Sequence, residues 1–228
     1  MKRTAAALSQ VLLGLSVLTA QDLRAATSAV HLESLGNTFD TAGQYTLGFQ
    51  FMATEAVRVV SLGVFDKGGD GIASGATVTL WRDDDGSVVA SALVPAGTAA
   101  ALVEGFRHAA IFPTTLTPGV FYVVGAYLPE GEATSFNMGD GGSTGSLDAR
   151  LAYVMDRNWD DGYDFPLGSD GVAGGAWLGA NFLLTPVPEP ASASLLAAGL
   201  LGVVLWRRRC VVPCKEGSLA ALAPTIRC

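Results

Sequence analysis

The stretch TVTLWRDDDGSVVASALV, residues 77–94, decides the fold class. Its two halves, 77–82 and 88–94, are rich in the aliphatic, β-branched and aromatic residues that suit a pleated, half-buried surface. Asp85-Gly86 lies between them, and such a dipeptide supplies the positive φ that a tight primed turn requires. The stretch therefore predicts an antiparallel β-hairpin.

Further runs of the same kind lie on both sides of this hairpin. Turn signals separate them, such as Gly-Gly-Asp-Gly at 68–71 and Pro-Gly at 118–119. No long segment carries a capped apolar repeat of 3.6 residues. Strands at this spacing predict an all-β domain, a β-sandwich or jelly roll, over residues 30–185. The further runs are 46–53, 57–65, 106–112, 120–127, 151–155 and 177–184.

The charge of this domain is strongly acidic. Residues 27–186 contain 6 Lys or Arg and 18 Asp or Glu, a net charge of −12, whereas the whole chain carries −7. An acidic surface repels phosphate backbones, so nucleic acid is not expected as a partner. The chain has three cysteines, and none can form a disulfide within the domain, because all of them follow it: Cys210, Cys214 and Cys228.

Residues 1–26 are predicted to be a secretory signal peptide. Lys2 and Arg3 precede an apolar run, residues 5–20, that falls short of a full membrane span. The Sec translocon and signal peptidase are therefore expected partners. A retained membrane anchor or a buried helix is the alternative. The candidate cleavage points follow small residues, namely Ala20, Ala26 and Ala29.

Residues 187–209 predict a single C-terminal transmembrane helix. Pro190 suits the first turn of a helix, and the run that follows it, up to Trp206, is uncharged. These residues would rise about 25 Å as a helix, slightly less than a bilayer core of about 30 Å. The basic cluster that ends the run places that end in the cytoplasm and the acidic domain outside, and it consists of Arg207, Arg208 and Arg209.

This segment resembles a PEP-CTERM protein-sorting domain. Pro188, Glu189 and Pro190 match the recognised motif, and Arg207, Arg208 and Arg209 match its basic stop. The resemblance implies processing by an exosortase, a membrane-embedded cysteine protease-transpeptidase of bacteria that make exopolysaccharide and biofilm matrix. The implied location is the cell surface or the extracellular space, after transient membrane anchoring. An ordinary single-pass anchor is the alternative.

The chain departs from that pattern beyond the arginines. Sorting segments of this kind normally end soon after the basic cluster, whereas here residues 210–228 follow. This tail is interpreted as a cytoplasmic extension of unknown role or as the product of an altered stop codon.

The middle region resembles the DUF4082 type of extracellular jelly-roll module. The residues that carry the likeness include GFQF at 48–51, LGVFD at 62–66, VTLW at 78–81 and YVVGA at 122–126. The resemblance covers about residues 44–128 and implies a surface-exposed, carbohydrate-rich setting. It implies no catalytic residues.

Acidic turns make calcium the one cofactor that the sequence suggests. Ca²⁺ takes six to eight oxygen ligands, which loop carboxylates can supply. The pattern at 156–162 only partly matches a calcium loop, because Gly162 falls one position late. Solvated turns, in which Asp bonds its own backbone, are the alternative. The candidate ligands are Asp66, Asp70, Asp156, Asn158 and Asp160.

Loop aromatics suggest a carbohydrate platform. Trp159 and Tyr163 are the best candidates, because polar loop residues flank them and aromatic rings can stack on sugars. Burial in a core is the alternative for any such ring.

The sequence gives little sign of catalysis. Residues 141–145 match the Gly-x-Ser-x-Gly pattern around Ser143, but no helix is expected after it, and His31 and His108 are the two histidines. We therefore expect a non-catalytic exported surface or matrix protein that binds extracellular polysaccharide. A secreted hydrolase acting on such a polymer is the alternative.

Overall fold

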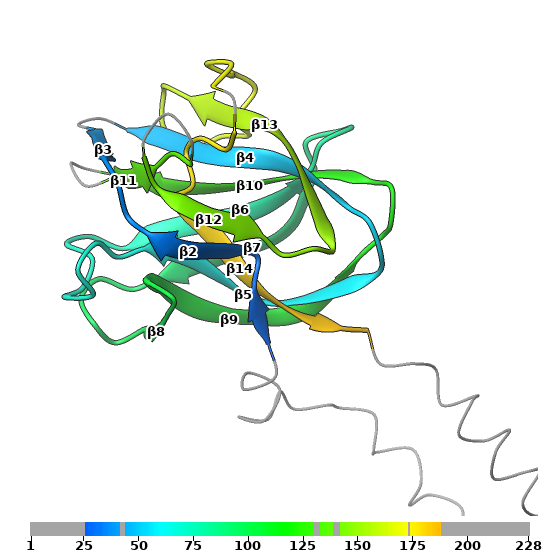
Figure 1. Ribbon diagram of the computed structural model, residues 1–228, viewed down its shortest axis with the longest axis horizontal. Helices are drawn as coiled ribbons and strands as arrows, with labels where there is room; N and C mark the ends of the chain where they lie inside the picture. Colours follow the sequence, from blue (N-terminus) through cyan, green and yellow to red (C-terminus); the bar gives the residue numbers. More distant parts are fainter. Residues whose placement is uncertain (1–25, 42–43, 130–132, 139–141, 173, 188–228) are drawn as a thin grey trace, which may run out of the picture. The chain divides into compact units, whose positions relative to one another are not determined.

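The computed structural model describes residues 26–41, 44–129, 133–138, 142–172 and 174–187 (Figure 1). This part of the chain is all-β and contains no helix. The signal peptide predicted at 1–26, the sorting segment at 187–209 and the tail at 210–228 lie almost wholly outside it. The strands are β1 (Thr27–Ser28), β2 (Val30–Ser34), β3 (Thr38–Thr41), β4 (Tyr45–Ala53), β5 (Val57–Phe65), β6 (Ala76–Arg82), β7 (Val88–Val94), β8 (Ala101–Val103), β9 (Phe106–Leu116), β10 (Phe121–Leu128), β11 (Ala133–Phe136), β12 (Thr144–Leu147), β13 (Leu151–Trp159) and β14 (Ala180–Pro186).

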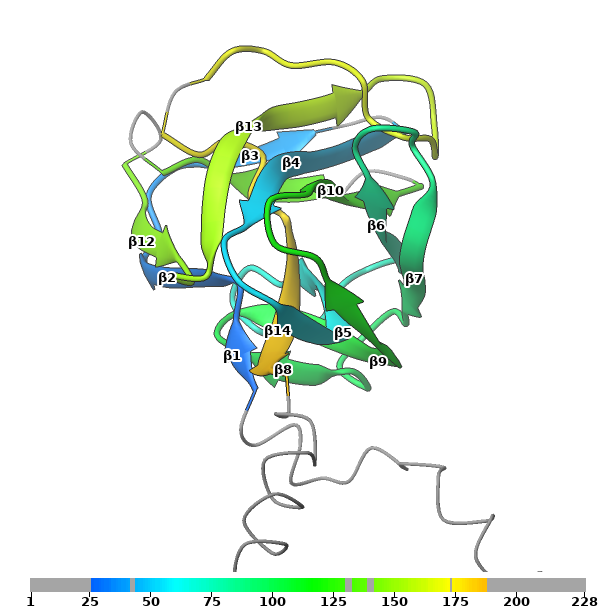
Figure 2. The same cartoon turned by 90° about the vertical axis from the view of Figure 1, so that its right-hand side faces the viewer.

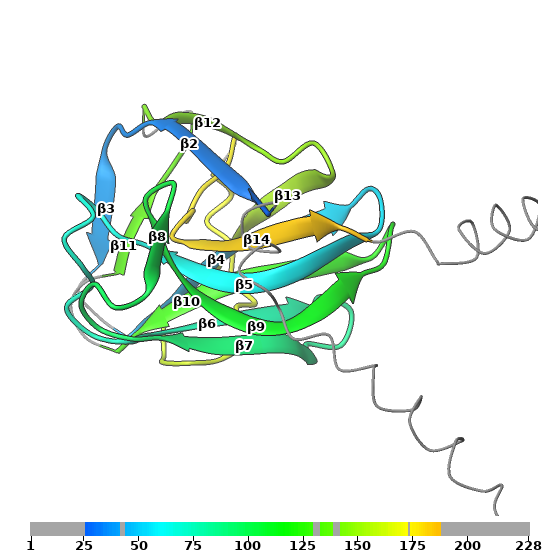
Figure 3. The same ribbon diagram turned by 90° about the horizontal axis from the view of Figure 1, so that it is seen from below.

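Two antiparallel five-stranded sheets form a β-sandwich, as the sequence predicts. One sheet has the order β1-β14-β5-β9-β8, and the other has the order β13-β4-β10-β6-β7. Figure 2 shows the two sheets as separate layers. Two short ribbons, β2 with β12 and β3 with β11, lie at the border of the sandwich (Figure 3). Because most neighbours in the two sheets come from distant parts of the sequence, the fold depends on long-range pairing.

The core lies between the two sheets. Phe51 from β4 meets Phe182 from β14, with ring centroids 5.2 Å apart, and both side chains are fully buried. A second aromatic group joins the β3–β11 ribbon to the sheet, because Phe136 contacts Phe65 and Phe106. At about 25 cal/mol per Å² of buried apolar surface, these contacts are the main source of stability in a domain without disulfides.

All eight strands predicted from the sequence are present; two have the predicted limits, 57–65 and 88–94, and the others have shifted ends. The predicted strand 177–184 begins later, at Ala180, because Trp177 has a φ of 56°. The 77–94 hairpin is also confirmed, but its turn is not a two-residue primed turn. Residues 83–87 connect β6 to β7, and Gly86 there has a positive φ of 67°.

The first strand of the sandwich begins at Thr27 and pairs with β14 next to the end of the domain. Thr27 lies opposite Leu184, so the chain enters and leaves the sandwich side by side (Figure 1). Ser28 and Ala29 are buried. Cleavage after Ala29 would remove β1, whereas cleavage after Ala20 or Ala26 keeps it. Of the three cleavage points predicted from the sequence, Ala20 and Ala26 are therefore compatible with an intact β1.

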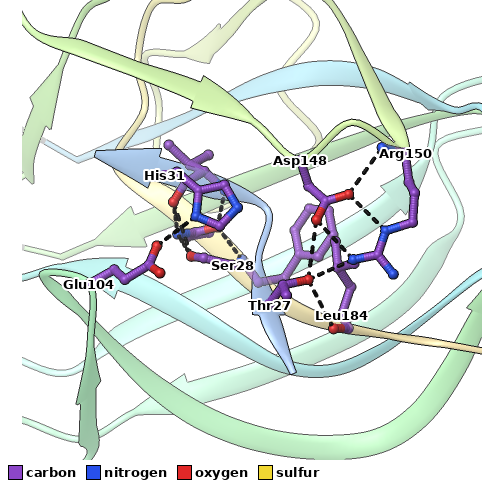
Figure 4. Close-up of polar contacts among 10 residues, drawn as sticks. Thr27, Ser28, His31, Glu104, Asp148, Arg150 and Leu184 are labelled. Atoms are coloured by element: carbon purple, nitrogen blue, oxygen red, sulfur yellow. Dashed lines mark hydrogen bonds and ion pairs between the residues drawn. The ribbon is translucent and has the colours of Figure 1, made fainter. Parts of the chain in front are cut away.

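A polar network anchors this first strand (Figure 4). The Thr27 hydroxyl donates to the Asp148 carboxylate and accepts from the Arg150 guanidinium at 2.6 Å. The hydrogen bond from the Arg150 side chain holds the pKa of Asp148 at about 2. The fully buried Asn181 side chain accepts from the Val30 backbone N–H and donates to Ser28. Two separate polar contacts therefore hold residues 27–30 in place.

Candidate functional site

A loop of residues 160–172 lies across the outer surface of the β13-β4-β10-β6-β7 sheet (Figure 2). The Thr46 hydroxyl on β4 donates to the Gly162 carbonyl, and the Gly162 N–H donates to the Gln44 carbonyl. Gly162 has a φ of 91°, which only glycine adopts without strain. The loop is therefore fastened to the sheet at its start.

Asp156 fastens the far end of this loop. Its carboxylate is fully buried and accepts hydrogen bonds from the Ser169 hydroxyl and from the backbone N–H groups of Asp170 and Val172. Two residues further along β13, the backbone N–H of Asn158 donates to the Gly168 carbonyl, and the Gly168 N–H donates to the Asn158 carbonyl. These contacts fold the loop back against the end of β13.

The folded loop and the end of β13 line a surface pocket of about 350 Å³ that is open to solvent. Trp159 forms its aromatic part, and its indole N–H donates to the Asp161 carbonyl at 3.2 Å. The exposed side chain of Asp160 supplies a carboxylate beside it. The pocket therefore combines an apolar ring with hydrogen-bond acceptors, and its lining is Asn158, Trp159, Asp160, Asp161 and Gly168.

Tyr163 does not line this pocket. Its hydroxyl bonds the Thr79 hydroxyl at 2.9 Å, and its ring contacts Trp81 and Tyr127. Although 46% of the residue is exposed, these contacts fix the ring on the outer face of the sheet. Of the two aromatic residues predicted as a sugar platform, the structure brings Trp159 to a pocket and uses Tyr163 to hold the loop.

The five candidate calcium ligands do not come together. Asp66 and Asp70 follow β5, whereas Asp156, Asn158 and Asp160 lie on or next to β13. Asp66 is paired with Arg107, and Asp156 accepts the three hydrogen bonds given above. Among the residues that the structure describes, no three His, Cys, Asp or Glu side chains group in a way that could hold a metal ion. The geometry gives the calcium prediction no support, because the two buried carboxylates already have donors.

Comparison with known families accounts for two parts of the chain. A family model for a domain of unknown function, DUF4082, matches residues 34–155, more than half of the sequence. The chain belongs to the DUF4082 family. A second model, for the PEP-CTERM protein-sorting motif, matches residues 186–209. No curated protein matches the chain significantly. Both resemblances drawn from the sequence are thus confirmed.

The structure extends the DUF4082 domain beyond its matched residues. Strand β14, after the match, lies between β1 and β5 in one sheet, so the sheet is incomplete without it. The pocket at Trp159 also falls after residue 155. The folded unit therefore includes residues 27–33 and 156–186 as well as the matched region.

The PEP-CTERM motif implies export, membrane anchoring before processing, and an exosortase as the processing partner. Its predicted recognition residues, Pro188, Glu189 and Pro190, and its basic stop, Arg207, Arg208 and Arg209, lie outside the described residues. Within the described residues, no helix is long and apolar enough to span a bilayer.

A buried ion pair joins two loops of the DUF4082 domain. The Arg107 Nε lies 2.7 Å from the Asp66 carboxylate, and the two side chains are 7% and 1% exposed. The rest of the guanidinium donates to the carbonyls of Gly69, Thr98 and Ala100. Asp66, predicted from the sequence as a calcium ligand, is thus the partner of Arg107. Arg107 lies opposite Val64 in the β5–β9 register, so Asp66, two residues after Val64, is its diagonal neighbour. No local sequence signal indicates this long-range pairing.

Ser143, which the Gly-x-Ser-x-Gly pattern singled out, is only 3% exposed. Its hydroxyl accepts a hydrogen bond from the Gly36 N–H at 3.0 Å. His31 is bonded to Glu104, and His108 to Ser61, so no histidine contact to Ser143 is present among the described residues. The local role of Ser143 is to hold the connection between β2 and β3.

His108 of the DUF4082 domain is buried against β5. Its ring lies over Gly63, where an added Cβ would come within 2.5 Å of the imidazole, and its Nδ1 lies 3.2 Å from the Ser61 hydroxyl. Burial lowers the pKa of His108 to about 4. The folded domain therefore favours the neutral form of His108.

The free energy of unfolding is expected to fall between pH 6.5 and pH 4 because of His108. The unfolded chain takes up this proton near pH 6.5, whereas the folded domain takes it up near pH 4, so acid favours the unfolded state. Across this whole pH range, the shifted pKa of His108 lowers the free energy of unfolding by about 3 kcal/mol. Urea unfolding at pH 7.5 and 4.5 measures it, with His108→Gln as the control. An equal loss in both proteins would contradict the assignment to His108.

Proposed function

We propose that this chain is an exported, non-catalytic surface or matrix protein that binds carbohydrate through the pocket at Trp159. The PEP-CTERM motif supports the surface location. The observation that carries the binding proposal is the pocket of about 350 Å³ in which an indole ring stands beside acidic residues.

The chemistry of the pocket suits a sugar. A pyranose ring has an apolar face of C–H groups and an equatorial rim of hydroxyls. Trp159 supplies a large, flat apolar surface on which the C–H face can stack. The Asp160 carboxylate can accept hydrogen bonds from the hydroxyls. Ligand sites commonly combine an apolar wall with a few placed polar groups, and this pocket has that composition.

The position of the pocket also supports this role. Trp159 ends β13 opposite Thr46, whereas Thr27 and the Asp148–Arg150 turn lie near the start of β13. The pocket and the chain termini of the domain are thus at opposite ends of that strand. A carrier attached after Pro186 would leave the pocket open.

Replacing Trp159 by alanine is expected to weaken binding of the cognate polysaccharide about tenfold or more, because it removes the stacking surface. The assay is a glycan array on the purified domain, followed by titration of the best ligand. Leu167→Ala is the matched control, since Leu167 lies in the same loop, is 64% exposed and does not line the pocket. Absence of any wild-type ligand, or equal affinities for both variants and wild type, would refute the proposal.

A further inference from the structure

Within the part of the chain that the structure describes, one side of the sandwich leaves a long strand edge open. Strand β7 ends its sheet, and beside it β9 belongs to the other sheet, where β8 covers only its first three residues, Phe106 to His108. A groove of about 520 Å³ runs between them. It is lined by residues 89–93 of β7 and by residues 109–112 and 114 of β9.

The strand segments that line this groove carry no charged residues, and large apolar side chains are exposed on this side. Phe112 is 89% exposed, Leu93 is 66% exposed and Val88 is 56% exposed. The sequence holds no Asp, Glu, Lys or Arg between residues 86 and 103 or between residues 108 and 128. Exposed strand edges in monomeric proteins are usually protected by charges, proline or covering segments. Strand β7 carries neither a charge nor a proline. The neighbouring β9 does carry a proline, Pro113, so β7 is the less protected of the two edges.

The edges on the other side of the sandwich are covered by the chain itself. At β13, Asn158 exchanges two backbone hydrogen bonds with Gly168, and at the β1 side the Ala29 carbonyl accepts from the Asp148 N–H. Among the described residues, the β7 edge has no such cover.

We propose that this edge binds a second copy of this domain, with β7 of one copy antiparallel to β7 of the other. Two copies that each carry a net charge of −12 repel one another over most of their surfaces. The uncharged segments of β7 and β9 that line the groove are where they can approach without opposing carboxylates. Pairing would join two five-stranded sheets across a two-fold axis and bury Leu93 and Phe112.

Such a pair would carry two Trp159 pockets. A polymer with repeated sugar units could then engage both pockets, which raises its apparent affinity without new contacts. The dimer itself does not depend on the carbohydrate proposal, and its test uses no sugar.

Sedimentation equilibrium of the domain, residues 26–187, tests the proposal. The wild type is expected to dimerise at tens of micromolar, and more strongly at 500 mM than at 50 mM NaCl, because salt screens the repulsion between acidic copies. Leu93→Lys is expected to raise the dimer dissociation constant at least about tenfold, because each copy would bring a lysine charge into the interface. Leu167→Lys is the control, with the same charge change at a similarly exposed leucine.

Phe112→Ser gives a second variant that adds no charge and should weaken the dimer in the same direction. A wild-type domain that remains monomeric at 200 micromolar in both salt conditions would overturn the proposal. So would equal dissociation constants for Leu93→Lys and Leu167→Lys, since the surface would then be elsewhere or serve another partner.

Discussion

Replacing Arg107 by alanine is expected to lower the free energy of unfolding of the domain by about 3–5 kcal/mol. The change leaves the Asp66 carboxylate buried without its guanidinium, and it also removes donors from the carbonyls of Gly69, Thr98 and Ala100. An unpaired buried charge costs far more than the pair contributes, which is why the loss is large. Urea unfolding followed by tryptophan fluorescence measures it.

Arg82→Ala is the matched control for this experiment. The Arg82–Asp84 pair has a similar distance, 2.8 Å, but its side chains are 42% and 60% exposed, so little change in stability is expected. Arg107→Lys should give an intermediate loss, because an ammonium keeps the charge but not the forked set of donors. Equal stabilities of the Arg107→Ala and Arg82→Ala proteins would show that the buried pair does not hold the two loops.

Replacing Asn181 by alanine is expected to cost about 2–4 kcal/mol of unfolding free energy. The Asn181 carbonyl oxygen accepts from the backbone N–H groups of Val30 and Phe182, and both would be left buried without a partner. The N-terminal strand should loosen first, so hydrogen exchange at residues 28–30 should accelerate more than exchange in β4 or β10.

Asn37→Ala controls for the loss of an amide side chain, since Asn37 is exposed in the connection between β2 and β3. Unchanged exchange at residues 28–30 in the Asn181→Ala protein would contradict the anchoring role. Faster exchange in every strand alike would also contradict it, because the effect would then be global rather than local.

The long strands could be predicted from the sequence because each carries its own signal. Val57–Phe65 and Val88–Val94 are bounded by turn residues, and their predicted limits coincide with those observed. The short strands could not be predicted, because they depend on distant partners. Thr144–Leu147 is four residues long and is a strand only because Val30–Ser34 pairs with it.

The candidate site was predictable only in part, for a similar reason. Polar flanking residues indicated Trp159, but nothing local distinguished it from Tyr163, whose hydroxyl meets Thr79 across 84 positions of sequence. The acidic residues show most clearly that a local pattern does not reveal which distant groups a side chain meets. Asp156 has the spacing of a metal ligand, yet the return of residues 169–172 satisfies its carboxylate with backbone and hydroxyl donors.

The central claim is that the chain is exported and then processed at its C-terminal sorting segment. Intact-mass measurement of the protein recovered from the cell envelope and the medium tests it most directly. We predict a polypeptide that starts at residue 21 or 27, retains β14, and has lost the arginine cluster together with everything after it. Recovery of a chain that still carries Arg207 through Cys228, with or without its N-terminal segment, would contradict the account.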